Sequence, residues 1–194
     1  MVTIRQAKVN DAASIAEGIY EAFLLPGSEL DNDPSFHQHW IDTLTEICAQ
    51  ADTHYSYHNT LVAEVDGKIA GIMIAVDGTN YRTQRERMYP QLKSIFDTAF
   101  GLGWEDMEDE AQAGEFYVDS IAVFPPYRHR GIGTNLLLHA KQRAKELNIP
   151  LITLAVEPMN SAKILYQELG FTYNRLITIF NEEYELLMVD TYEK

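Results

Sequence analysis

Apolar residues recur every three or four positions in five stretches of the chain, and this spacing predicts amphipathic helices. The stretches lie at about residues 11–24, 34–51, 81–100, 135–147 and 161–169. Asp33 followed by Pro34 predicts an N-cap and first turn for the second helix, and Gly170 predicts the end of the last one. Pro90 lies inside the third stretch and is expected to split or bend that helix.

Shorter apolar runs, several of them alternating with polar residues, predict strands. These runs lie at about residues 2–7, 60–66, 68–77, 116–124, 151–156, 171–179 and 184–189. Asp66-Gly67 predicts a tight hairpin between the second and third runs, because the turn requires positive φ angles. The run at 151–156 lacks alternation, which suits a central strand buried on both faces. With no repeat or linker, the pattern predicts one α/β domain with a mixed sheet.

Composition limits the classes of partner. A chain of 194 residues, 46% hydrophobic and 23% charged, suits one domain with one core. Its formal net charge of -14 argues against nucleic acid as a partner, because phosphate binding needs a basic face. An acidic surface attracts cationic partners such as amines, although it more often serves solubility.

The single cysteine, Cys48, cannot form an intrachain disulfide and lies between apolar neighbours, which favours core packing in a reducing compartment. The N-terminus shows no signal-peptide pattern, and no apolar run approaches 18 residues. We therefore expect a cytoplasmic protein without a membrane partner.

Two further groups of polar residues invite functional interpretations. His37 and His39, and His54 and His58, lack the ligand pattern of a metal site, so we predict no metal and expect these histidines to be solvated. The acidic run from Trp104 to Glu115 is typical of a solvated loop or helix face. Its functional alternatives are a lip that attracts a cation and a protein-docking or dimer surface.

A glycine loop connects the strand at 116–124 with the helix at 135–147. The segment Tyr127–Thr134 contains Gly131 and Gly133 together with three cationic or ionisable side chains, those of Arg128, His129 and Arg130. Glycines at a helix N-terminus let successive backbone N–H groups approach an anion. An ordinary strand-to-helix turn remains the alternative for this loop taken alone.

Two other segments make the pattern specific. Ser120-Ile121-Ala122-Val123 precedes the loop, and Asn160-Ser161-Ala162 leads to Leu165-Tyr166 and then to Gly170-Phe171. With the loop, these segments resemble the GNAT superfamily of acetyl-CoA-dependent N-acyltransferases, most clearly from Tyr117 to Phe171. The resemblance implies a single-domain GNAT fold with a mixed, mostly antiparallel central sheet flanked by helices. A helical, acidic insertion is expected at about 79–114.

The resemblance also implies which residues contact the cofactor, coenzyme A. Backbone N–H groups of the loop would hold its pyrophosphate, and the strand before the loop would pair with the pantetheine arm. The implied cofactor-binding residues are Ile121, Ala122, Val123, Arg128, His129, Arg130, Gly131, Ile132, Gly133, Thr134 and Asn160.

The implied reaction is direct attack of a neutral amine on the thioester, with acetyl-CoA as donor and no metal. Tyr166 matches the position of the tyrosine that protonates the departing sulfur in this family. Glu115, Tyr117 and Asp119 lie on one face of a strand by its period of two. Tyr117 stands where better-known members carry a glutamate base, so the base stays open, and Asp119 is preferred because it is near the thioester segment.

The expected acceptor is the primary amine of a small cationic or peptidyl substrate, bound by the first two helices and the insertion. The rival hypothesis is a catalytically silent acyl-CoA-binding regulatory module. A homodimer is a further expectation about partners.

Overall fold

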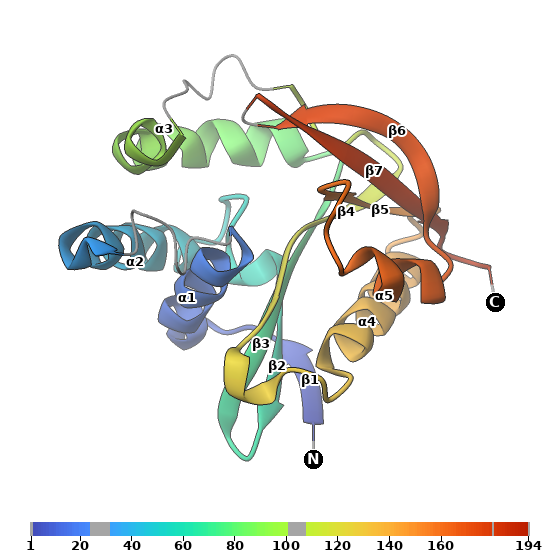
Figure 1. Ribbon diagram of the computed structural model, residues 1–194, viewed down its shortest axis with the longest axis horizontal. Coiled ribbons are helices and arrows are strands. Elements are labelled where there is room, and N and C mark those ends of the chain that lie inside the picture. The colour runs from blue at the N-terminus through green and yellow to red at the C-terminus, as the bar shows by residue number, and fades with distance from the viewer. Residues whose placement is uncertain (1, 24–31, 101–107, 180, 194) are drawn as a thin grey trace.

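One mixed sheet of seven strands runs through the molecule in the order β1-β2-β3-β4-β5-β7-β6 (Figure 1). This computed structural model describes residues 2–23, 32–100, 108–179 and 181–193. The strands are β1 Val2–Gln6, β2 Thr60–Val65, β3 Lys68–Asp77, β4 Glu115–Val123, β5 Leu151–Val156, β6 Thr172–Ile179 and β7 Glu182–Asp190. Among these described strands, β4 and β5 pair in parallel and the other pairs are antiparallel, which confirms the predicted mixed, mostly antiparallel sheet.

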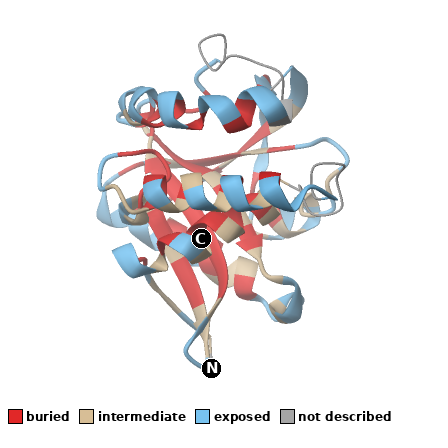
Figure 2. Cartoon of the chain, turned by 90° about the vertical axis from the view of Figure 1, so that its left-hand side faces the viewer, coloured by how far each residue is buried: buried red, intermediate tan, exposed pale blue. Residues whose placement is uncertain are grey.

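Helices cover both faces of this sheet. They are α1 Ala12–Ala22, α2 Pro34–Cys48, α3 Tyr81–Phe100, α4 Ile132–Glu146 and α5 Lys163–Glu168, with short 3-10 turns at Val9–Asp11, Tyr57–Asn59 and Pro125–Tyr127. Helices α1, α2 and α3 lie on one side, and α4 and α5 on the other (Figure 1). Buried residues line the interior, while the outer helix faces are exposed (Figure 2).

The two sides have separate hydrophobic clusters. Trp40, fully buried, packs with α1, α3 and the β3 residues Ile72 and Ile74. Leu136 and Tyr166 belong to the cluster formed by α4, α5 and the other face of the sheet. Successive residues of β3 therefore point to opposite faces of the sheet: Ile72 and Ile74 belong to the first cluster and Met73 to the second.

Local sequence signals produce the expected turns and caps. The Asp33 carboxylate accepts hydrogen bonds from the amides of Ser35 and Phe36 and caps α2. Asp66 and Gly67 adopt positive φ angles of 51° and 75° in the β2–β3 hairpin. Pro90, however, does not split α3, which continues from Tyr81 through this residue to Phe100.

An irregularity in β4 positions the site described below. Ile74 of β3 pairs with Ser120, but Ala75 pairs with Val118, so Asp119 has no partner on β3. An extra residue of this kind forms a β-bulge, which bends the strand and redirects its side chains. After the bulge, Ala122 joins the cluster on the α1 side.

Candidate active site at the parting of β4 and β5

The central parallel pair separates beyond Val118. Its register runs from Glu115 opposite Leu151 to Val118 opposite Leu154 and goes no further. Strand β4 continues to Val123 and β5 to Val156, so each strand has backbone beyond the last pair. The bulge at Asp119 directly follows the last pair, and backbone groups past this point can pair with an extended amide chain.

The glycine loop lies at the end of β4 that is past the parting. Gly131 is the N-cap of α4 with φ +71°, and His129 also has a positive φ, of 60°. A side chain at Gly131 would meet no atom within 4 Å, but one at Gly133 would lie 3.4 Å from Leu165 of α5. The first turn of a helix leaves its N–H groups without intrahelical acceptors. The loop thus presents amide donors in the conformation that suits an anion.

The cationic side chains of the loop have contacts of their own. Arg128 donates through Nε to the Val123 carbonyl at 2.9 Å and pairs with Glu21 of α1, also at 2.9 Å. The amide of Arg128 donates to Pro125 at 3.3 Å. Arg130 lies over the Tyr127 ring at 5.7 Å from its centroid. Arg128 therefore ties the loop to β4 and α1, and the amides that follow it are the available donors.

The segment before and within α5 borders the same region. The Asn160 side chain accepts a hydrogen bond from the Ala162 amide at 2.9 Å and so shapes the turn into the helix. Tyr166 is 7% exposed and belongs to the same cluster as Ile121 and Val123. Burial raises the pKa of Tyr166 to about 12.

On the opposite side of β4, Asp119 meets a histidine 65 residues away in sequence. His54 Nε2 lies 2.9 Å from Asp119 Oδ2, and the Ser120 hydroxyl donates to Asp119 Oδ1 at 2.7 Å. His54 is 1% exposed, so the expectation of a solvated histidine is wrong here. The bulge aims Asp119 at the loop after α2, where packing holds the His54 ring 5.1 Å from Tyr81.

A second buried carboxylate lies close to this pair. Glu110 accepts a hydrogen bond from the Tyr117 hydroxyl and lies 3.9 Å from the guanidinium of Arg85. Arg85 also donates to the Tyr81 hydroxyl at 2.8 Å. Of the acidic run, residues 104–107 lie outside the described residues. Glu108 and Asp109 are exposed as predicted, whereas Glu110 and Glu115 are buried, contrary to the prediction of a solvated face.

The surroundings shift the pKa values of the Asp119 and Glu110 carboxyl groups in opposite directions. Burial would raise the pKa of Asp119, but its interaction with His54, the Ser120 hydrogen bond and the charge of Arg85 outweigh burial and lower this pKa. Burial, followed by the charge of Asp119, raises the pKa of Glu110 against the opposing effect of Arg85. Divergent carboxyl pKa values are typical of groups with different roles in proton transfer.

The face predicted from the strand period is confirmed for Tyr117 and Asp119. The Tyr117 ring lies 5.7 Å from Tyr81, whose ring in turn contacts that of His54. The sequence did not single out Glu110 or Arg85 because nothing in a local pattern shows that distant segments bury them together.

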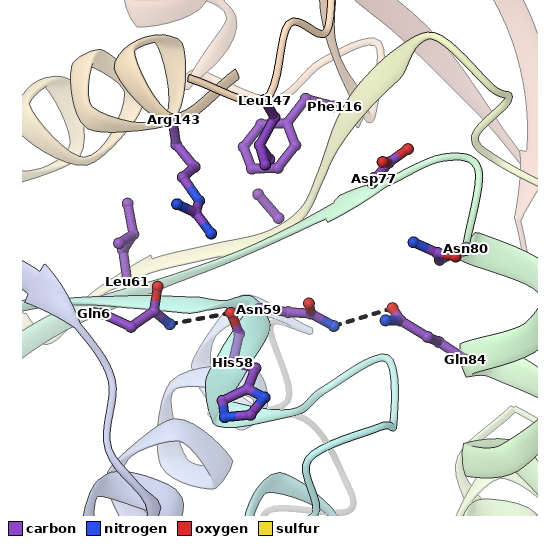
Figure 3. A pocket seen from close by; sticks show the side chains of 11 residues that line it. Gln6, His58, Asn59, Leu61, Asp77, Asn80, Gln84, Phe116, Arg143 and Leu147 are labelled. Carbon is purple, nitrogen blue, oxygen red and sulfur yellow. Dashed lines mark hydrogen bonds between the residues drawn. The ribbon is translucent and has the colours of Figure 1, made fainter. Parts of the chain in front are cut away.

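A cavity of about 100 Å³ lies apart from both the glycine loop and the cluster around Asp119 (Figure 3). Arg143 and Leu147 at the end of α4, Asp77 at the end of β3 and Phe116 at the start of β4 line it. It thus lies at the ends of α4 and β4 remote from the glycine loop. The sequence-predicted cofactor residues do not line it.

Metal-ligand groups and membrane-spanning helices are considered next, for the described residues. No group of three or more potential metal ligands occurs in this part of the chain. In the same part, no helix combines the length and apolar character required to span a membrane.

The seven-strand sheet, its parted central pair and the glycine loop place the chain in the class of GNAT-fold acyltransferases. The Acetyltransferase (GNAT) family model matches residues 17–171, and the chain belongs to this family, whose chemistry is acyl transfer. The resemblance seen in the sequence is thereby confirmed.

Solved structures agree over nearly the whole chain. An acetyltransferase structure is 28% identical with a TM-score of 0.74, covering 97% of this chain and 99% of its own. The N-acetyltransferase from Staphylococcus aureus Mu50 is 26% identical with a TM-score of 0.74, covering 96% and 100%. PaiA N-acetyltransferase from Thermoplasma acidophilum, in complex with coenzyme A, shares the fold at 16% identity and a TM-score of 0.57, covering 98% and 99%. A comparison with curated proteins found no significant match.

Proposed function

We propose that the protein transfers an acetyl group from acetyl-CoA to the primary amine of a small cationic or peptidyl substrate. The observation that carries this proposal is the parting of β4 and β5 after Val118, next to a loop rich in free amide donors. The parted strands offer unpaired backbone to the amide-containing pantetheine arm, and the loop offers N–H groups to the pyrophosphate.

The cofactor contacts follow from this placement. Amides from His129 to Thr134 hold the pyrophosphate, where Gly131 and Gly133 keep side chains out of the way. Backbone groups of Ile121–Val123 pair with pantetheine, and one N–H directed at the thioester oxygen stabilises the oxyanion by about 3–4 kcal/mol. Asn160 contributes from the turn into α5, where its own side chain is fixed by Ala162.

Tyr166 acts on the leaving group. Its phenol has a pKa of about 12, well above the value of about 8.5 for a thiol, so complete proton transfer to a free thiolate is uphill. A hydrogen bond from the hydroxyl to the sulfur still stabilises charge as the C–S bond breaks. The amine is mostly protonated at neutral pH and must lose a proton first, and Asp119 is well placed to contact this ammonium group.

A panel of amines tests the proposal. Acetyl-CoA turnover should be measured with spermidine, free amino acids and short peptides that carry a free N-terminus. At least one cationic amine should be acetylated. Uniform inactivity with all of them, together with measurable coenzyme A binding, would select the silent binding module instead.

Tyr166→Phe separates the two hypotheses further. It should lower kcat about 100-fold, at the lower end of the range for general acid catalysis, and leave the Kd for acetyl-CoA unchanged. Tyr173→Phe is the matched control, because Tyr173 on β6 is 57% exposed. Steady-state kinetics and calorimetric titration with acetyl-CoA provide the readouts. Unchanged turnover in Tyr166→Phe would remove this residue from the mechanism.

The buried single cysteine agrees with a reducing compartment, and we place the enzyme in the cytoplasm as part of the same proposal. Fractionation of cells that express the full chain tests this placement.

A further inference from the structure

Glu110 and Asp119 are two carboxylates held differently in one buried cluster on the acceptor side of β4. Glu110 comes from the segment before β4 and is bonded to Tyr117, whereas Asp119 sits on the bulge and is bonded to His54. Arg85 of α3 is a permanent cation that acts on both carboxylates. Two carboxylates that share the charge of one arginine suit the binding of a further cation.

His54 provides an independent indication of a ligand. Its Nε2 contacts Asp119, while its Nδ1 is buried and has no hydrogen-bond partner among the described residues. A buried ring nitrogen without a partner is uncommon in folded proteins, so the hydrogen bonding around His54 is completed by a group from outside the described residues.

We propose that the two carboxylates divide the work on the acceptor amine: Asp119, oriented by His54, contacts the ammonium group, and Glu110 receives its proton. This inference rests on the proposed amine acetylation. It makes Glu110 a catalytic residue and His54 a positioning residue.

The geometry favours this division over a single carboxylate. Asp119 is bonded to both His54 and Ser120, which stabilise its charged form and make it a weak proton acceptor. Burial raises the pKa of Glu110, which brings this carboxylate closer to the range where it can accept a proton. Tyr117, which occupies the strand position of the family's glutamate base, holds Glu110 by its hydroxyl.

The proton balance is complete within the reaction. An N–H bond of the ammonium breaks as an O–H bond forms on Glu110, and the free amine attacks the thioester carbon. The C–N bond forms, the C–S bond breaks, and the second amine proton ends on the coenzyme A thiol. Glu110 then returns its proton to solvent before the next turnover.

Several titratable groups face Glu110 and set its protonation. They are Tyr81, Arg85 and Tyr89 of α3, Tyr117 and Asp119 of β4, Tyr55 of the loop after α2 and Tyr184 of β7. The charge of Asp119 raises the pKa of Glu110, so removing that charge must lower it.

The pH dependence of kcat for Glu110→Gln and Asp119→Asn tests the division, using an amine that the panel shows to be acetylated. Glu110→Gln should lower kcat about 100-fold or more and abolish the acidic limb of the profile, because the carboxylate whose protonation produces this limb is gone. Asp119→Asn should raise KM for the amine about tenfold and keep the acidic limb, moved to lower pH.

A matched control and a positioning variant complete the design. Glu108→Gln removes one exposed charge from the same segment and should leave kcat and KM unchanged, since Arg85 is bonded to the Glu108 carbonyl. His54→Phe should raise the amine KM as Asp119→Asn does. A normal amine KM in His54→Phe would remove its positioning role.

Retention of kcat and of the acidic limb in Glu110→Gln would overturn the proposal, and so would loss of that limb in Asp119→Asn alone. An infrared difference titration of wild type against Glu110→Gln reads the same carboxyl without turnover. Glu110 should titrate above the ordinary glutamate value of about 4.3, and a carboxyl still ionised below that pH would also overturn the proposal. Absence of acetylation with every amine would instead contradict the proposed function.

Discussion

The two sides of β4 are built on different principles. On the proposed cofactor side, backbone amides of consecutive residues from His129 to Thr134 form the proposed binding site for the pyrophosphate. On the acceptor side, side chains from the loop after α2, from α3, from the segment before β4 and from β4 itself converge in one buried cluster. The side with the glycine loop depends on local backbone conformation, and the side with the buried side-chain cluster depends on tertiary packing. Mutations should therefore act differently on the two sides.

The largest effect on acetyl-CoA binding should come from Gly131→Val. A β-branched residue at φ +71° costs about 1–2 kcal/mol, and the shift of the loop should weaken acetyl-CoA binding at least about tenfold. Gly67→Val is the matched control, because Gly67 has φ +75° in the hairpin and equally free surroundings. It should destabilise the fold similarly without changing the acetyl-CoA Kd. Equal effects of the two variants on Kd would contradict the loop assignment.

Opposite pH dependences of stability should distinguish the two carboxylates on the acceptor side. The folded-state pKa of Asp119 is lowered, so its carboxylate stabilises the fold above the unfolded pKa, and this contribution is lost as pH falls through the folded value. The folded-state pKa of Glu110 is raised, so the stability linked to its protonated form is present below the unfolded pKa and is lost as pH rises through the folded value.

Denaturation of Asp119→Asn and Glu110→Gln between about pH 3 and pH 8 measures this contrast. The loss of unfolding free energy in Asp119→Asn should grow with rising pH, and that in Glu110→Gln should shrink, each by on the order of 1 kcal/mol. Urea midpoints at several pH values provide the data, and wild type is the reference at each. Slopes of the same sign would show that one environment governs both carboxyls.

Arg128→Ala should have the smallest effect. Its side chain is half exposed and its ion pair with Glu21 is a surface contact, so the expected loss of stability is below about 1 kcal/mol. Because the proposed pyrophosphate donors are backbone amides, the acetyl-CoA Kd should change less than in Gly131→Val. A larger loss of affinity in Arg128→Ala would mean that side-chain charge dominates the proposed pyrophosphate site.

Local sequence patterns are sufficient to predict most helices and strands and the glycine loop of the proposed cofactor site. The Asp66-Gly67 turn and the Asp33 cap are local, because they depend on neighbours within a few residues. The glycine loop is local in part: Gly131 permits the positive φ at the start of α4, whereas the contact of Arg128 with Glu21 of α1 depends on the fold. The family resemblance predicted a mixed, mostly antiparallel sheet flanked by helices, and the observed sheet confirms this prediction.

The buried cluster on the proposed acceptor side could be recognised only in the folded chain. The sequence predicted a solvated His54 and a solvated acidic run, yet packing buries His54 against Asp119 and buries Glu110 against Tyr117. A buried charge is tolerated only when partners compensate it, and those partners come from segments up to 65 residues apart. Local hydrophobic patterns carry no information about such pairs, because they appear only once the sheet has brought the segments together.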